Sequence, residues 1–160
     1  MAYIFDTNIF IRSKNEMPME VWPTFWKRMT EMIKSGKVYS SIEVKKEIDK
    51  GHDELTEWIH KNASDAFYYA IDEEVLAKYE ETQNWARSNP ILNENARNEY
   101  AIVADAYLVA TAAAKGLKVV TYETSNPNCK RRVKIPDACN AIGVQFCDLN
   151  TALKEMGITI

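Results

Sequence analysis

Short, largely apolar runs recur along the chain and predict buried strands. Residues 2–6 and 117–121 are the clearest, because Tyr, Ile, Phe, Leu and Val stand nearly side by side there. Such runs are typical of strands that are covered on both faces of a parallel sheet. Weaker runs predict further strands at 37–40, 67–70 and 144–147.

Helices are predicted between these strands, because apolar residues recur there at three- and four-residue spacing. Phe25, Trp26, Met29, Met32 and Ile33 mark one helix, which should end before Gly36. Ser41 and Asp72 are expected N-caps, and Leu76 is expected on the inner face of the helix after Asp72. The other expected helices cover Leu55 to Ile59, 101–115, 136–142 and 149–156, with a loop or irregular helical link over 87–98 and a loop over 126–134.

Strands that alternate with helices predict an α/β fold. We expect a three-layer α/β/α sandwich around a mostly parallel sheet of about four to five strands. The chain has 160 residues and shows no repeat, low-complexity tract or linker. A single domain over residues 1–160 is therefore expected.

Composition narrows the class of protein. Hydrophobic residues make up 46% and charged residues 27%, which is typical of soluble globular proteins. No apolar run is long enough for a membrane span, and no signal peptide is visible, so a cytoplasmic protein is predicted. Cys129, Cys139 and Cys147 match no zinc-site spacing and are interpreted as reduced thiols. His52 and His60 are interpreted as solvent-facing.

Four acids fall where a parallel sheet would place a ligand site. Asp6 ends the first strand, Glu123 follows the strand at 117–121, and Glu47 and Asp105 lie on helices beside apolar residues. Ligand sites of open α/β sheets lie at the carboxyl ends of the strands, so we expect these acids to converge. Each has an ordinary alternative: Asp6 as a turn residue or helix cap, Asp105 as a helix cap, Glu47 paired with a lysine of its own helix, and Glu123 in an exposed turn.

Converging carboxylates point to a metal. They repel one another unless a cation neutralises them, and an all-oxygen site suits Mg²⁺ or Mn²⁺ better than Zn²⁺. Such ions position phosphate oxygens and activate water, so the acids predict phosphodiester chemistry.

The segments that carry these acids resemble the motifs of the PIN domain family, a metal-dependent ribonuclease fold common among toxins of bacterial and archaeal toxin–antitoxin pairs. The resembling segments are 4–10 (IFDTNIF), 41–48 (SIEVKKEI), 105–112 (DAYLVATA) and 119–123 (VVTYE). Two features depart from the family. Glu123 stands where the family usually has Asp, which leaves Asn126 as an alternative ligand, and 124–136 is longer than in compact toxins. A divergent PIN-like branch is therefore indicated.

The resemblance implies an endoribonuclease that acts as the toxin of a type II toxin–antitoxin system. Its catalytic residues would bind one or two Mg²⁺ or Mn²⁺ ions: Asp6, Glu47, Asp105 and Glu123. Asn8 and Thr121 would hydrogen-bond the carboxylates or the metal-bound waters. A metal-bound water would cut RNA to leave a 5′-phosphate and a 3′-hydroxyl. The implied partners are RNA, a cognate antitoxin and a second copy in a homodimer.

A basic segment follows the fourth motif. Lys130, Arg131, Arg132 and Lys134 could hold RNA phosphates, or they could lie on a solvated loop. The net charge of −3 includes the four acids, so it does not exclude an RNA substrate.

Two other functions fit parts of the pattern. A PIN fold could serve as a docking module without nuclease activity. A haloacid-dehalogenase-type phosphohydrolase also begins with a strand that ends in Asp, but it would need a second Asp where this chain has Asn8.

Overall fold

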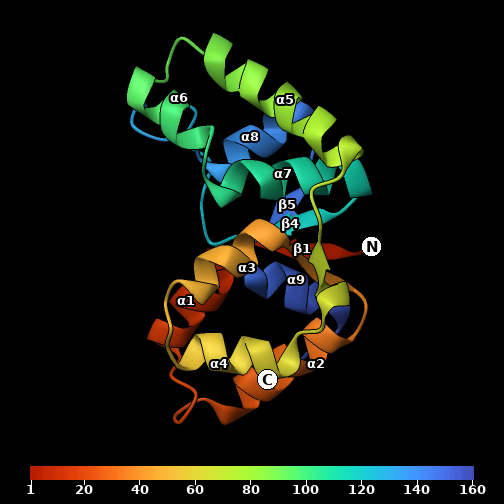
Figure 1. Ribbon diagram of the computed structural model, residues 1–160. Coiled ribbons are helices and arrows are strands. Elements are labelled where there is room, and N and C mark those ends of the chain that lie inside the picture. The colour runs from red at the N-terminus through yellow and green to blue at the C-terminus, as the bar shows by residue number, and fades with distance from the viewer.

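A five-stranded, all-parallel sheet forms the centre of the molecule (Figure 1). The computed structural model describes all residues, 1–160. The strands are β1 (Tyr3–Phe5), β2 (Val38–Ser41), β3 (Tyr68–Tyr69), β4 (Lys118–Val120) and β5 (Phe146–Cys147). Their order in the sheet is β3-β2-β1-β4-β5, so both edge strands are only two residues long.

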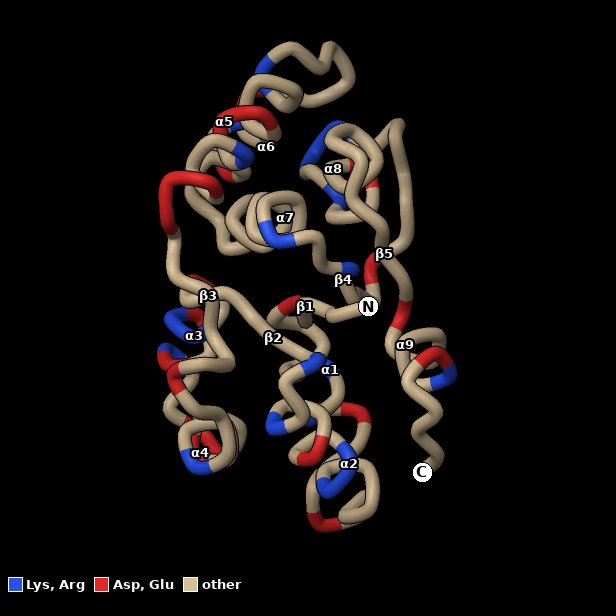
Figure 2. The backbone as a smooth tube through the Cα atoms, turned by 90° about the vertical axis from the view of Figure 1, so that its right-hand side faces the viewer, with Lys and Arg blue, Asp and Glu red and all other residues tan.

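Helices cover both faces of this sheet, which gives the expected three-layer α/β/α sandwich. One layer contains α5 (Glu73–Ser88), α6 (Glu94–Tyr100), α7 (Ala104–Lys115) and α8 (Ile135–Ile142) (Figure 2). The other contains α1 (Thr7–Glu16), α2 (Pro23–Lys34), α3 (Ile42–Asp49), α4 (Glu54–Asn62) and α9 (Leu149–Met156). Helix α3 also contacts α7, so it joins the two layers.

The apolar run at the start of the chain is buried as its pattern predicts. Tyr3, Ile4 and Phe5 of β1 are at most 3% exposed, and Ile9 and Phe10 of α1 are fully buried. Burying each of the larger side chains stabilises the fold by about 1.5–3 kcal/mol. The central strand is thus fixed firmly, and with it the position of the residue that follows, Asp6.

Helix ends follow the residues expected to cap them. The side chain of Ser41 accepts a hydrogen bond from the N–H of Glu43, and that of Asp72 accepts one from Val75. Helix α7 ends at Gly116, whose φ of 68° lies in the left-handed region that glycine adopts without strain. The two predicted caps are confirmed, and the helix expected over 101–115 does end at Lys115.

Three local predictions differ from the structure. A helix, α1, begins directly after Asp6, where the sequence pattern predicts none. The helix expected from residue 101 begins at Ala104, and 94–100 forms the separate helix α6. Leu76 is 46% exposed rather than buried, because Val75 occupies the inner face of α5 at that turn.

Other expectations concern the cysteines, the histidines and membranes. All three cysteines are free thiols. His52 and His60 are exposed, and His60 lies 2.5 Å from Asp49. No helix of the structure combines the length and the apolar character that crossing a membrane requires.

Candidate functional site

The strand order reverses between β1 and β4, which are neighbours in the sheet. From β1 the chain continues to β2 on one side, and from β4 it continues to β5 on the other. Such a reversal leaves a crevice at the carboxyl ends of the two strands. Asp6 directly follows β1, and Thr121 directly follows β4.

Asp6 is a buried carboxylate in this crevice, with only 1% of the residue exposed. Burial, then the charge of Glu123, raises the pKa of Asp6 to about 7, with a smaller contribution from Glu47. The hydroxyl of Thr121 donates to Asp6 Oδ2 at 3.1 Å and opposes this rise. The backbone N–H of Asn8 also favours the charged form of Asp6 and lowers its pKa, although the distance and angle of a full capping hydrogen bond are not reached. Asp6 thus occupies the N-cap position of α1, as one alternative expected, but its side chain forms no capping hydrogen bond.

Asp105 lies in the first turn of α7, one residue beyond the start of the helix. Burial raises its pKa to about 8, and the charges of Asp6, Glu123 and Glu47 contribute to this rise, while Arg132 opposes it. The N-cap of α7 is Val103, so Asp105 is not a helix cap. The structure thus brings all four acids into one electrostatic environment.

Glu47 reaches this environment from α3. It forms no ion pair, because the lysines of its helix pair with other acids, Lys45 with Asp49 and Lys46 with Glu43. Pairing within its own helix therefore does not account for Glu47.

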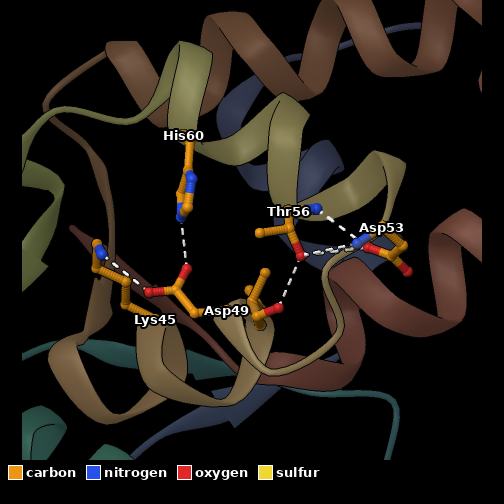
Figure 3. Close-up of polar contacts among 6 residues, drawn as sticks. Lys45, Asp49, Asp53, Thr56 and His60 are labelled. Carbon is orange, nitrogen blue, oxygen red and sulfur yellow. Dashed lines mark hydrogen bonds and ion pairs between the residues drawn. The ribbon is translucent and has the colours of Figure 1, made fainter.

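The junction of α3 and α4 holds this helix in place (Figure 3). Asp49 accepts a hydrogen bond from Lys45 and contacts His60, and the hydroxyl of Thr56 donates to the carbonyl of Ile48 at 2.8 Å. Thr56 also closes a capping box with Asp53 at the start of α4. These contacts cross-link the two helices just after Glu47.

Glu123 is held by two donors rather than left in an exposed turn. The N–H of Ile135 donates to its Oε2 at 3.0 Å, and Arg132 donates to its Oε1. Only 11% of the Glu123 side chain is exposed. The Thr121 hydroxyl accepts from the N–H of Glu123 at 3.1 Å, so one threonine bridges Asp6 and Glu123.

Arg132 is the cation that two of the acids, Glu123 and Asp105, face. Besides its bond to Glu123, its Nη2 lies 3.9 Å from Asp105 Oδ2. The sequence pattern places it with the other basic residues of its loop and does not predict this pairing. The one clue in the sequence is the short separation between Glu123 and the basic segment.

The fit of the acids to a divalent ion is chemical rather than geometric. All four offer carboxylate oxygens, the ligands that Mg²⁺ and Mn²⁺ prefer. However, no three His, Cys, Asp or Glu side chains are arranged to hold a metal ion. Arg132 stands between Glu123 and Asp105, so a shared ion would require this guanidinium to move.

The remaining expected site residues lie around this centre. Asn8 is exposed, and its side chain forms no hydrogen bond within the protein, whereas Thr121 bonds Asp6 as expected. The N–H of Asn126 donates to Asp137 of α8 at 2.9 Å. Lys130 and Arg131 are exposed and Lys134 is half-buried, and none of the three has a carboxylate partner.

Fold and site together define a class: an α/β protein with a buried Asp and further acids at the switch point of a parallel sheet. The chain belongs to the family DUF4411, described as a domain of unknown function, whose model matches residues 3–160. The search of curated proteins found no match.

Proposed function

We propose that this protein is a metal-dependent endoribonuclease. The observation that carries the proposal is the pair Asp6, which is buried, and Asp105, whose side chain is 23% exposed. The charged form of each carboxylate is disfavoured by loss of solvation and by the neighbouring acids. Such perturbed groups concentrate at functional sites, because a fold without use for them would be more stable with apolar residues there. A docking module would gain nothing from this arrangement.

A divalent ion would relieve this repulsion. Asp6, Glu47, Asp105 and Glu123 would hold one or two Mg²⁺ or Mn²⁺ ions, whose chemistry is to polarise phosphate oxygens and to make a water nucleophilic. Thr121 fixes the orientation of the Asp6 carboxylate through its 3.1 Å hydrogen bond. Cleavage would leave a 5′-phosphate and a 3′-hydroxyl.

The basic side chains would hold the RNA backbone. Lys130, Arg131 and Lys134 have no carboxylate partner within ion-pair distance, so they are available to phosphates. Arg132 would leave Glu123 for a phosphate oxygen when the ion binds. In this proposal the protein is a cytoplasmic toxin of a type II toxin–antitoxin system, a homodimer that a cognate antitoxin restrains.

A cleavage assay on a 5′-labelled single-stranded RNA tests the proposal. We expect the parent to cut RNA with Mg²⁺ or Mn²⁺ and to stop with EDTA, and Asp105→Asn to lose most of the activity. Asp65→Asn, a change of an exposed acid in the short 3₁₀ helix Asp65–Phe67, is the matched control. Mn²⁺ should also raise the melting temperature of the parent, because a ligand that binds only the folded state stabilises it. Cleavage that is independent of metal or unchanged in Asp105→Asn would contradict the proposal.

A further inference from the structure

A cavity of about 570 Å³ lies beside the acids. Its walls come from the end of α5 and the link to α6, from the loop that follows β4, and from α8, all at one end of the molecule (Figure 1). This volume falls within the range of small-molecule sites. Arg132 lines the cavity and also contacts Glu123 and Asp105, so the cavity adjoins the candidate active site.

Hydrogen bonds hold the loop wall of this cavity. Asp137 of α8 accepts bonds from the Ser125 hydroxyl at 2.5 Å and from the N–H of Asn126 at 2.9 Å. Farther along the loop, the carbonyl of Lys130 accepts from the N–H of Asn93 at 3.0 Å. The loop is thus attached to both α8 and the start of α6, and the cavity is formed before any ligand binds.

The opposite wall is also fixed. Arg97 of α6 donates to the carbonyl of Asn89 at 2.6 Å. Trp85 of α5 packs edge-on against the buried Tyr100, with ring centroids 6.5 Å apart. The half-buried indole of Trp85 therefore has a fixed place in the lining.

The lining combines the groups that recognise a nucleotide. Trp85 offers an aromatic surface on which a base can stack, and Asn126 and Asn140 offer amides that can both donate to and accept from base edges. Arg132 and Lys134 supply positive charge for a phosphate.

We propose that this cavity binds one base of the RNA substrate, the nucleotide next to the bond that is cut. The base would stack on Trp85, and its phosphate would lie against Arg132 and Lys134, toward the acids. A stacked duplex cannot place one base in a cavity, so the substrate is single-stranded. The identity of the substrate rests on the proposed function, whereas binding of the base requires no metal.

The test is a titration of the metal-free parent in EDTA with AMP, GMP, CMP and UMP, with ribose 5-phosphate as the base-free probe. Binding is followed by the NMR signal of the Trp85 indole N–H, assigned by its loss in Trp85→Phe. We expect at least one monophosphate to bind about tenfold more tightly than ribose 5-phosphate, because stacking of a base on an aromatic side chain contributes a factor of this order.

Variants locate the binding. Ala141→Phe fills the cavity from an exposed position on α8 and should weaken nucleotide affinity about tenfold or more. Ala77→Phe, at an exposed position of α5 outside the cavity, should change nothing. Asn140→Asp is a second, nearly isosteric change that should also weaken binding, since a carboxylate repels the phosphate.

The outcome separates this inference from the proposed function. Tight nucleotide binding that Ala141→Phe and Asn140→Asp both weaken supports the base site, even for a protein that cuts no RNA. Equal affinity for ribose 5-phosphate and all four monophosphates overturns it, and so does affinity that neither variant changes, even if the parent cleaves RNA with Mg²⁺.

Discussion

Replacing Asp6 by Asn should stabilise the metal-free protein at neutral pH. The pKa of Asp6 is raised from 3.8 to about 7, so between these values the folded state holds a proton that the unfolded state has released. The free energy of unfolding therefore falls as pH rises through this window and is lowest above pH 7. Asn at this position carries no charge, so the free energy of unfolding of the variant should not show this decrease with pH.

The expected size follows from the shift. About three pKa units at about 1.4 kcal/mol each give an upper value of about 4 kcal/mol, which relaxation of the site reduces toward about 2 kcal/mol. The amide oxygen of Asn can still accept from the Thr121 hydroxyl, so the hydrogen bond at 3.1 Å can persist in the variant. Parent and variant should have nearly equal stability at pH 4 and should differ most at pH 8.

Urea unfolding in EDTA at pH 4, 6 and 8 measures this difference. Asp72→Asn is a control for which the opposite change in the free energy of unfolding is expected. Asp72 pairs with Lys115 at 2.6 Å, and this partner lowers its pKa, so the variant should be less stable than the parent at neutral pH. An Asp6→Asn variant that is no more stable than the parent at pH 8 would refute the expected destabilisation by the charged form of Asp6. Mn²⁺ should raise the stability of the parent more than that of Asp6→Asn.

Three other changes test the site and the fold. Glu123→Gln weakens the pairing with Arg132 and should reduce RNA cleavage, though less than Asp105→Asn does. Activity equal to that of the parent across a Mg²⁺ titration would show that Glu123 is not part of the site. Changing Lys130 and Arg131 to Ser should weaken RNA binding equally for every RNA sequence. The slope of log K against log salt should become smaller in magnitude by about 0.7 for each phosphate that is no longer neutralised, and an unchanged slope would contradict phosphate binding. Gly116→Ala should destabilise the fold by about 1 kcal/mol in urea unfolding, because the φ of 68° strains any residue with a Cβ. Unaltered stability would contradict the left-handed conformation of residue 116.

Strands and caps could be predicted from the sequence because each depends on nearby residues. The buried run at β1, the cap at Ser41 and the glycine at the end of α7 are local patterns, and the structure follows them. Helix α1 could not be predicted in this way, because Ile9, Phe10 and Ile11 continue the apolar run of the strand before it, and β-branched residues favour strands. Here packing against the sheet outweighs local preference.

The acids could be placed together because parallel strands bring their carboxyl ends to one edge. The contacts of Arg132 could not be predicted, because they depend on how the long loop returns to α8. That path is set by the bonds of Asp137 to the start of the loop and by the burial of Val133, which is 6% exposed. The cavity likewise depends on segments that meet only in the folded chain.

The two edge strands of the sheet are short, and this limits how copies of the protein can associate. Strands β3 and β5, at the two edges of the sheet, are two residues long and offer few unpaired backbone groups to a neighbouring chain. Two copies of the protein therefore have little to gain from joining their sheets edge to edge. A homodimer would form through helices or loops, where substitutions of surface side chains can strengthen or abolish it without disturbing the sheet.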